Sequence, residues 1–428
     1  MEELFQLFYN CSEVSTDTRK ISDNTLFIAL KGDNFDGNKY AQQAIDKGAK
    51  YAIVDDPHFA NGEKIFLVDD CLKFLQLLAA HHRDEFDIPI LAITGTNGKT
   101  TTKELTAAVL TKKYNVLYTL GNLNNHIGVP LTLLQLNKKH DMAIIEMGAS
   151  KLGDIKELTD IVQPTHGIIT NIGHAHIEGF GSPENIIKTK TELYTAILDK
   201  KGHLFYNSDD ALLENKLPDS CPTSTYGTKN EADIQGGIID LSPMLIFSWK
   251  SNTYSSPSIK TQIIGKYNFY NMLAAIAIGN FFQIDNKEIN SALKEYKPSN
   301  NRSQLEKTKY NTVILDAYNA NPTSVKSALE SFAEINSADK MFVLGDMLEL
   351  GENSTNYHIE IIQLSKQLKL QGMFVGSIYS ALAKENDILA FNSTDKAKEF
   401  FSTALPKDNL ILLKGSRGIG LEKLIDIL

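Results

Sequence analysis

The chain is poor in cysteine and contains no long hydrophobic run. Its three cysteines, Cys11, Cys71 and Cys221, are an odd number without short spacing, which excludes a disulfide framework and a zinc knuckle. No stretch reaches the roughly eighteen apolar residues that a membrane-spanning helix needs. The N-terminal segment carries Glu2 and Glu3 but no basic stretch, so we expect no export signal. These absences together predict a cytoplasmic protein that neither crosses nor enters a membrane.

An excess of basic residues is also lacking. Lysine and arginine total 43 against 52 aspartates and glutamates, a formal net charge of −9, which argues against general binding to nucleic acid or to anionic membranes. Low-complexity tracts, heptads and fixed-period repeats are not visible. The 428 residues, 42% of them hydrophobic, exceed what one core usually supports. We therefore expect two or three domains, and we expect the protein to act as a monomer.

The pattern of apolar runs divides the chain into three blocks, 1–84, 85–298 and 299–428. In each block apolar strands alternate with helical stretches, which is typical of parallel sheets covered by helices. The prediction is therefore an α/β protein of three domains: a small α/β domain, a central parallel-sheet domain of P-loop ATPase type and a C-terminal Rossmann-like domain. Strands are expected at 25–30, 51–54, 65–68, 90–94, 116–119, 142–145, 168–170, 204–206, 312–315, 341–344, 373–375 and 410–413, and helices at 39–48, at 71–86, at 183–197 and, as the final helix, after Lys414.

The most informative segment is a buried strand that leads into a glycine-punctuated turn and the start of a helix. Gly95 and Gly98 allow positive φ and bring backbone N–H groups close to an anion. Lys99 adds a positive charge, and the Thr100 hydroxyl can ligate Mg²⁺ at the helix start. The usual loop has a glycine where this chain has Ile93, so we expect a shortened variant. The segment predicts a nucleotide-phosphate site.

Polar side chains stand directly after several predicted strands, where ligands bind in open α/β sheets. Glu146 is the best metal candidate among them, because Mg²⁺ held with phosphates needs only one or two protein carboxylates. His174 and His176 follow another strand; they are compatible with a zinc pair, with a Mg²⁺-phosphate site or with a structural role. Lys190 lies on the helix expected at 183–197, and the residues alone favour a place on the helix surface.

Several short motifs, in their order along the chain, resemble those of the Mur ligase family, the ATP-dependent amide ligases of peptidoglycan synthesis. They are the segments 95–101, 146–149 and 170–176, Lys190 before Glu192, and Asn268 with Asn271. The resemblance covers essentially the whole chain. It implies an enzyme that uses ATP and two Mg²⁺ ions in cytoplasmic cell-wall biogenesis, and hence in cell shape and division.

Two further segments indicate the branch of the family. The segments 316–322 and 344–351, the latter followed by His358, resemble the ligases that add D-alanyl-D-alanine to UDP-MurNAc-tripeptide through an acyl phosphate. The segments 15–19 and 27–32 resemble the part that binds the UDP end. The alternatives are a MurE-like ligase that adds an amino acid, a ligase like folylpolyglutamate synthetase, and a nucleotide-binding module without catalysis.

The resemblance also implies a role for individual residues. The catalytic set is Lys99, Lys190, Glu146, His176 and Arg302. The nucleotide set is Gly95, Thr96, Asn97, Gly98, Lys99, Thr100, Thr101, Asn268, Asn271, Arg302 and Asp316. The metal ligands are Thr100, Glu146, His176 and Lys190, with Lys190 carbamylated. The residues that bind the two other substrates are Ser15, Thr16, Arg19, Asn122, Asn124, Asn125, Asn319, Asn321, Ser416 and Arg417. The family usually has histidine at the position of Tyr267.

Overall fold

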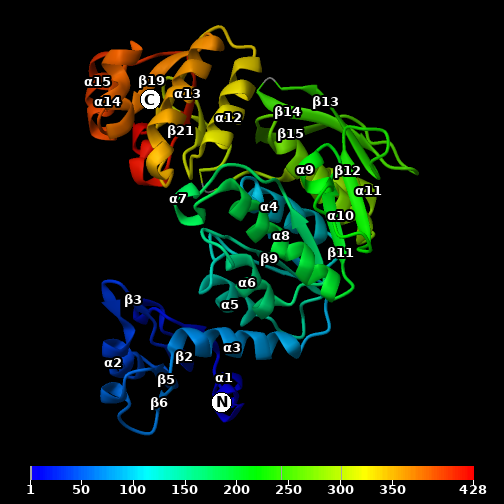
Figure 1. The fold of residues 1–428 in the computed structure, drawn as a ribbon, viewed down its shortest axis with the longest axis vertical. Coiled ribbons are helices and arrows are strands. Elements are labelled where there is room, and N and C mark those ends of the chain that lie inside the picture. Colours follow the sequence, from blue (N-terminus) through cyan, green and yellow to red (C-terminus); the bar gives the residue numbers. More distant parts are fainter. Residues whose placement is uncertain (1, 242, 300) are drawn as a thin grey trace.

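Three larger, parallel-rich sheets follow one another along the chain in the residues that the structure describes, 2–241, 243–299 and 301–428 (Figure 1). The structure is a computed structural model. The predicted α/β class is confirmed, and most of the expected strands are present within one or two residues. None of the helices in these described ranges is long and apolar enough to cross a membrane.

The N-terminal sheet is parallel throughout, in the order β1-β2-β5-β6. Its strands are β1 (Glu13–Ser15), β2 (Thr25–Ile28), β5 (Tyr51–Val54) and β6 (Ile65–Leu67), and it is accompanied by α1 (Glu2–Tyr9), α2 (Ala41–Asp46) and the small hairpin β3 (Lys31–Gly32) with β4 (Phe35–Asp36). The helix expected at 39–48 is a 3-10 turn, Gly37–Tyr40, that continues into α2. All residues of β2 are buried, because this strand lies in the interior of the sheet.

Helix α3 (Cys71–Asp84) connects the N-terminal sheet to the central part of the chain (Figure 1). Asp70 caps its N-terminus, because the Asp70 side chain accepts a hydrogen bond from the Lys73 N–H at 2.8 Å. Its apolar face shares one hydrophobic core with α5 (Gly128–Leu133) and α6 (Asp154–Val162). The helix is thereby packed against both neighbouring sheets.

The central sheet has the strand order β15-β14-β13-β12-β11-β10-β7-β9-β8 and is parallel from β8 to β13. Its strands are β7 (Ile90–Thr94), β8 (Val116–Tyr118), β9 (Met142–Glu146), β10 (His166–Ile169), β11 (His203–Asn207), β12 (Thr223–Gly227), β13 (Ile234–Asp240), β14 (Met244–Lys250) and β15 (Ile259–Ile264). Strand β7 lies between β9 and β10, so the strand order reverses there. The crevice at such a switch point is where open α/β sheets bind ligands.

Helices cover both faces of the central sheet. One core cluster holds α4 (Lys99–Leu110), α10 (Asn268–Phe281) and α11 (Asn286–Glu295), and the other holds α6 and α8 (Pro183–Asp199). The alternating side chains of β7 divide between the two clusters, as expected for a strand buried on both faces. Two short helices, α7 (Ile177–Phe180) and α9 (Ala211–Glu214), follow β10 and β11.

The C-terminal sheet has the order β16-β17-β21-β18-β19-β20, and only β16 runs antiparallel to its neighbour in the described part of the chain. The strands are β16 (Gln304–Lys307), β17 (Thr312–Asp316), β18 (Lys340–Gly345), β19 (Gln371–Val375), β20 (Ala390–Phe391) and β21 (Leu410–Lys414), and the helices are α12 (Pro322–Glu334), α13 (Ser354–Gln367), α14 (Ser377–Asn386) and α15 (Thr394–Thr403). A final α-helix is expected after Lys414, and this expectation is wrong. The chain forms two 3-10 turns there, separated by Gly420 at φ 72°.

Candidate active site

The loop between β7 and α4 has the conformation that its glycines predict. Gly95 has φ 143° and Gly98 has φ 82°. A Cβ atom at Gly95 would lie 2.0 Å from the Thr170 hydroxyl, and one at Gly98 would lie 2.6 Å from Asn271 Oδ1. Only glycine fits these two positions, and the loop leads directly into the first turn of α4, whose N–H groups have no partner within the helix.

The segment after the neighbouring strand β10 holds this loop in place. Asn171 Oδ1 accepts a hydrogen bond from the Asn97 N–H at 3.0 Å, and Asn171 Nδ2 donates to the Asn97 carbonyl at 2.9 Å. The Thr170 hydroxyl donates to the same carbonyl at 2.6 Å. Parallel pairing of β7 and β10 brings the two segments together at one sheet edge. Asn171 therefore positions the loop, a role that the strand-end pattern indicated only in general terms.

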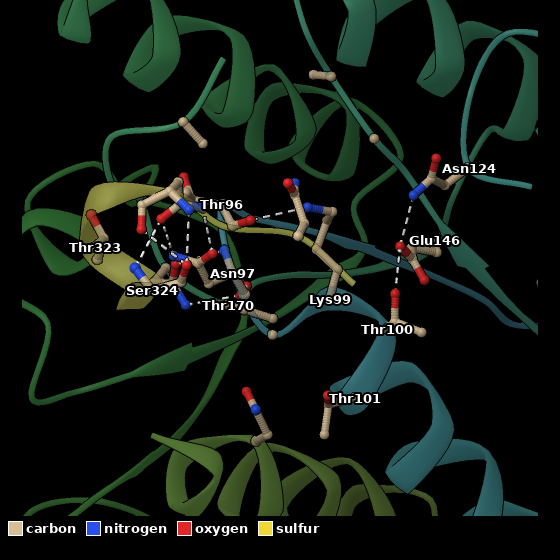
Figure 2. Close-up of a pocket in the computed structure, with 18 of the residues that line it drawn as sticks. Thr96, Asn97, Lys99, Thr100, Thr101, Asn124, Glu146, Thr170, Thr323 and Ser324 are labelled. Carbon is tan, nitrogen blue, oxygen red and sulfur yellow. Dashed lines mark hydrogen bonds between the residues drawn. The ribbon is translucent and has the colours of Figure 1, made fainter. Parts of the chain in front are cut away.

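Glu146 ends β9 and is almost fully buried, with 1% of its surface exposed. Its Oε1 atom accepts hydrogen bonds from the Thr100 hydroxyl at 3.0 Å and from Asn124 Nδ2 at 2.8 Å (Figure 2). Its Oε2 atom is buried and has no hydrogen-bond partner among the described residues. Lys103 Nζ lies 3.8 Å from Oε2. An unsatisfied buried carboxylate oxygen beside a hydroxyl fits a hard cation such as Mg²⁺.

Sequence reasoning missed Lys103, because it reads as an ordinary lysine near the start of a helix. In the structure only 1% of it is exposed, since α10 packs against α4. Its ammonium group lies 3.9 Å from Glu104 Oε1 as well as near Glu146. Burial lowers the pKa of Lys103, while Glu146 and Glu104 oppose this shift. No pattern in the sequence distinguishes this lysine from a surface residue.

Lys99 and Lys190 both donate hydrogen bonds to carbonyl groups of the loop. Lys99 Nζ donates to the carbonyls of Gly95 at 2.9 Å and Thr96 at 3.1 Å. Lys190 Nζ donates to the Gly95 carbonyl at 3.1 Å, and the residue is 3% exposed, so the helix-surface interpretation of Lys190 is wrong. Burial lowers the pKa of Lys190 well below its usual value, and the nearby charge of Lys99 adds to the shift. Burial also lowers the pKa of Lys99, against the effect of Glu146.

The two histidines after β10 contact different partners, which argues against a zinc pair. His174 Nδ1 lies 3.2 Å from the Tyr357 hydroxyl, whereas His176 Nδ1 lies 2.5 Å from Glu349 Oε2. Burial lowers the pKa of His176, and Glu349 opposes this shift. The described residues contain no group of three or more His, Cys, Asp or Glu that could hold a metal ion.

The C-terminal sheet contributes charged side chains to the same site. The Arg302 guanidinium lies 3.6 Å from the ring centre of Tyr318, and its Nε atom is buried without a hydrogen-bond partner in the described structure. Asp316 Oδ2 forms an ion pair with Lys414 Nζ at 2.7 Å. Tyr267 donates its hydroxyl to the same carboxylate at 3.4 Å. Burial, followed by the charge of Asp316, raises the pKa of Tyr267 well above its usual value.

The two asparagines at the start of α10 form a connected pair. Asn271 Nδ2 donates to Asn268 Oδ1 at 2.9 Å, and Asn271 Oδ1 accepts from the Thr102 hydroxyl at 3.1 Å. Asn268 Nδ2 in turn donates to Ser303 Oγ at 3.0 Å. Both asparagines line the same cavity as the glycine loop, and Asn271 lies next to Gly98.

One cavity of about 740 Å³ collects most of the predicted site residues. The predicted residues that line it are Thr96, Asn97, Gly98, Lys99, Thr100, Thr101, Asn122, Asn124, Asn125, Glu146, His176, Asn268, Asn271, Arg302, Asp316, Asn319 and Asn321. Gly95 and Lys190 lie directly behind its wall. Because the lining comes from both the central and the C-terminal sheet, a ligand in this cavity would contact both.

The remaining predicted residues lie outside the cavity lining. Ser15 ends β1 of the N-terminal sheet, and Thr16 and Arg19 follow it; exposed Arg19 pairs with Asp17 at 2.8 Å. Ser416 and Arg417 follow β21; Ser416 Oγ accepts a hydrogen bond from the Leu348 N–H at 3.0 Å, and the Arg417 guanidinium lies 5.6 Å from the Tyr318 ring.

Asn125 and Asn321, which also line the cavity, have structural partners. Asn125 Oδ1 accepts the Gly128 N–H at 2.8 Å, at the start of α5. Asn321 Oδ1 accepts the Ser324 N–H at 2.8 Å at the start of α12, while Asn321 Nδ2 donates to Asn97 Oδ1 at 2.8 Å. Asn321 thus connects the C-terminal sheet to the glycine loop.

Comparison with known families gives matches along most of the chain. The family models described as "Mur ligase family, catalytic domain", "Mur ligase middle domain" and "Mur ligase, glutamate ligase domain" match residues 10–83, 93–279 and 301–417. The UDP-N-acetylmuramoyl-tripeptide--D-alanyl-D-alanine ligase of Bacillus subtilis is 37% identical, with 96% of this chain and 92% of the relative covered.

Solved structures resemble the whole fold. A crystal structure of MurF from Acinetobacter baumannii is similar with a TM-score of 0.88 and 30% identity, covering 99% of this chain and 97% of the other. A crystal structure of MurF ligase from Thermotoga maritima in complex with ADP has a TM-score of 0.85 and 25% identity, covering 98% of this chain and 97% of the other.

Proposed function

The chain belongs to the Mur ligase family, and from this membership we propose that it joins D-alanyl-D-alanine to UDP-MurNAc-tripeptide with conversion of ATP to ADP and phosphate. A carboxylate oxygen of the tripeptide attacks the γ-phosphorus of ATP, which gives an acyl phosphate and ADP. The amino group of the dipeptide then attacks the acyl carbon. The tetrahedral intermediate expels phosphate and leaves the new amide.

The glycine loop is the part of the chain that we expect to hold the ATP phosphates. Its N–H groups and the first turn of α4 offer hydrogen-bond donors to an anion. Lys99 donates to two loop carbonyls, and rotation of its side chain brings the ammonium group to the β and γ phosphates. Arg302, whose Nε atom is buried without a partner in the described residues, supplies a second positive charge. Positioning and charge neutralisation therefore carry the first step, without a protein nucleophile.

The residues around Glu146 fit a magnesium ion. Glu146 Oε2 is the unsatisfied buried oxygen, and the Thr100 hydroxyl is bonded to the other oxygen of the same carboxylate. We propose that Thr100 and Glu146 hold Mg²⁺, which when bound supplies positive charge against the transferring phosphoryl group. Asn124 keeps the carboxylate oriented through its hydrogen bond to Oε1.

Lys190 and His176 are the proposed ligands of a second Mg²⁺, with Lys190 as a carbamate. A carbamate forms when a neutral amine adds to carbon dioxide and releases a proton. Burial favours the neutral amine of Lys190, because the pKa of this group lies well below its usual value. Its Nζ atom is 3.1 Å from the Gly95 carbonyl, directly behind the loop that we expect to hold the phosphates.

We propose that the three blocks 1–84, 85–298 and 299–428 divide the substrates among them. Ser15, Thr16 and Arg19, at the end of β1 and directly after it, would bind the UDP end, and the central block would bind ATP. Ser416 and Arg417 would bind the carboxylate of the dipeptide. We also propose that the protein acts as a monomer. The substrates are those of cytoplasmic precursor synthesis, so we propose a cytoplasmic location.

The observation that carries the proposal is the shared cavity. The loop, the Thr100–Glu146 pair and Arg302 line one space, although they come from different sheets. We propose to measure phosphate release with ATP and Mg²⁺ in three assays. The first contains UDP-MurNAc-tripeptide and D-Ala-D-Ala, and the second contains UDP-MurNAc-tripeptide and single amino acids. The third contains folate and glutamate and tests the folate alternative. Release that requires D-Ala-D-Ala supports the proposal. Release with a single amino acid or with folate indicates one of the related ligases, and release with none indicates a binding module.

A further inference from the structure

His176 and Glu349 meet where the central part of the chain contacts the C-terminal part. His176 precedes α7, and Glu349 belongs to the loop 346–350 that follows β18; α7 contacts the 3-10 turn Gly351–Asn353, which comes directly after this loop. Their side chains approach to 2.5 Å. Both residues have left-handed backbones, with φ 51° for His176 and φ 64° for Glu349. Such conformations are unfavourable for non-glycine residues and persist where the surrounding structure imposes them, often at functional sites.

The loop that carries Glu349 is held by buried hydrogen bonds. His358 Nε2 accepts the Met347 N–H at 3.0 Å, and His358 Nδ1 lies 2.7 Å from the Ser354 carbonyl, to which it donates. Ser416 Oγ accepts the Leu348 N–H at 3.0 Å. The loop is therefore attached on one side to the buried His358 and on the other to the segment that we expect to bind the dipeptide carboxylate. Glu349, between them, keeps 62% of its side chain exposed.

The other carboxylates near the cavity already have protein partners. Glu146 is bonded to Thr100 and Asn124 through Oε1, and its unsatisfied Oε2 is the oxygen that we assign to Mg²⁺, while Asp316 is paired with Lys414. Asp154 accepts N–H groups of its own loop, and Asp210 caps α9. Glu349 contacts His176, a cavity-lining residue, and no other hydrogen bond or ion pair of Glu349 occurs in the described structure. A second ligand can therefore reach its remaining oxygen.

We propose that Glu349 binds the ammonium group of the incoming dipeptide and orients its nitrogen next to His176. This inference rests on the proposed function. D-Ala-D-Ala enters as a zwitterion, so its ammonium group needs an anionic partner as its carboxylate needs a cationic one. Ser416 and Arg417 lie on the loop that is hydrogen-bonded to the neighbour of Glu349. The two adjoining loops thus offer opposite charges to the two ends of one small molecule.

The test compares two ligands that differ only at the group in question. D-Ala-D-Ala and D-lactoyl-D-alanine, which carries a hydroxyl in place of the amino group, are titrated into the enzyme with UDP-MurNAc-tripeptide, Mg²⁺ and a non-hydrolysable ATP analogue. For Glu349→Gln we expect about tenfold weaker binding of D-Ala-D-Ala and unchanged binding of D-lactoyl-D-alanine. In steady state the KM for the dipeptide rises, and the KM for ATP does not. Glu352→Gln removes the same charge from an exposed neighbouring position and leaves both affinities unchanged.

The outcomes separate this inference from the proposed function. If Glu349→Gln weakens the binding of both ligands equally, Glu349 only stabilises the contact between the central and the C-terminal part of the chain, and the inference is overturned. Unchanged binding of D-Ala-D-Ala overturns it as well. If the wild-type enzyme does not bind D-Ala-D-Ala, the proposed function itself fails. Equal thermal unfolding midpoints of the two variants and the wild type establish that the comparison is between folded proteins.

Discussion

Replacement of Lys103 by methionine tests how the protein holds the buried carboxylate of Glu146. Both residues are 1% exposed, and Lys103 Nζ lies 3.8 Å from Glu146 Oε2. At this separation two unit charges attract by about 4 kcal/mol with an effective dielectric constant near 20. Removing one partner of a buried pair typically costs about 3–5 kcal/mol, because the other charge stays buried without compensation. We therefore expect Lys103→Met to lower the free energy of unfolding by about 3–4 kcal/mol.

The single tryptophan makes this measurement specific for the central domain. Trp249 lies in β14, is 2% exposed and belongs to the same core cluster as α4, the helix of Lys103. Urea unfolding followed by its fluorescence, at pH 7.5 without added metal, reports the stability of this part of the chain. The double variant Lys103→Met/Glu146→Gln removes both charges. It should lose clearly less than the sum of the two single variants, because neither charge is then left alone.

Lys112→Met is the matched control. Lys112 follows the same helix and pairs with Glu295 at 3.1 Å, but at the surface, so its replacement should cost less than about 1 kcal/mol. A loss of less than about 1 kcal/mol for Lys103→Met would refute the reasoning. Additive losses in the double variant would do the same, since they would mean that Lys103 and Glu146 do not stabilise each other.

Three further changes have defined outcomes. Gly95→Ala places a Cβ 2.0 Å from the Thr170 hydroxyl at a φ of 143°, and it should cost about 2–4 kcal/mol in urea unfolding and abolish ADP binding in a calorimetric titration. Burial lowers the pKa of His166 to about 4. Below about pH 6.5 the unfolded state takes up a proton at this residue and the folded state does not, so the free energy of unfolding falls between pH 6.5 and 4. This fall should be about 3 kcal/mol larger in the wild type than in His166→Phe. Tyr318→Leu removes the ring under Arg302 and should raise the KM for ATP about fivefold.

Each of these changes has its own control or contradicting result. Gly62→Ala has a similarly positive φ but open space around the new Cβ, so any loss of stability there measures backbone strain alone, and ADP binding is retained. For the histidine, a pH dependence of stability in His166→Phe equal to that of the wild type would contradict the assignment. Tyr318→Phe keeps the aromatic face and should keep the KM; a rise as large as in Tyr318→Leu would mean that the hydroxyl, and not the stacking, matters.

The strands of this fold could be predicted because each is an apolar run long enough to cross the sheet once. β7 and β9 are buried at every position, which is the pattern of a parallel strand covered on both faces. The end of the chain could not be predicted in the same way. The segment after Lys414 is apolar enough for a helix, but Gly420 adopts a left-handed backbone and divides it into two short turns. The tertiary position of a glycine, and not its presence, decides this outcome.

Some of the site residues could likewise be predicted from the sequence, and others could not. Glu146 and the glycine loop were predictable because the carboxyl ends of adjacent parallel strands meet at one edge, so position in the sequence gives position in space. Lys103 and Glu349 were not. Lys103 is buried by α10, which lies far along the chain, and Glu349 meets His176 only through the packing of two domains. The partners of side chains on helices and loops depend on tertiary packing, which a local sequence pattern does not predict.

The charges around the loop explain why its structure suits a polyphosphate. The ammonium groups of Lys99, Lys103 and Lys190 lie close to the loop or its helix, and Glu146 is the buried carboxylate near them. Burial lowers the pKa of all three lysines, and the charge of Lys99 lowers that of Lys190 further. A polyphosphate supplies negative charge at this point and so stabilises the protonated form of each amine that it contacts. Two adjacent ammonium groups repel each other, so the nearby charge of Lys99 adds to burial in favouring the neutral amine of Lys190, which is only 3% exposed.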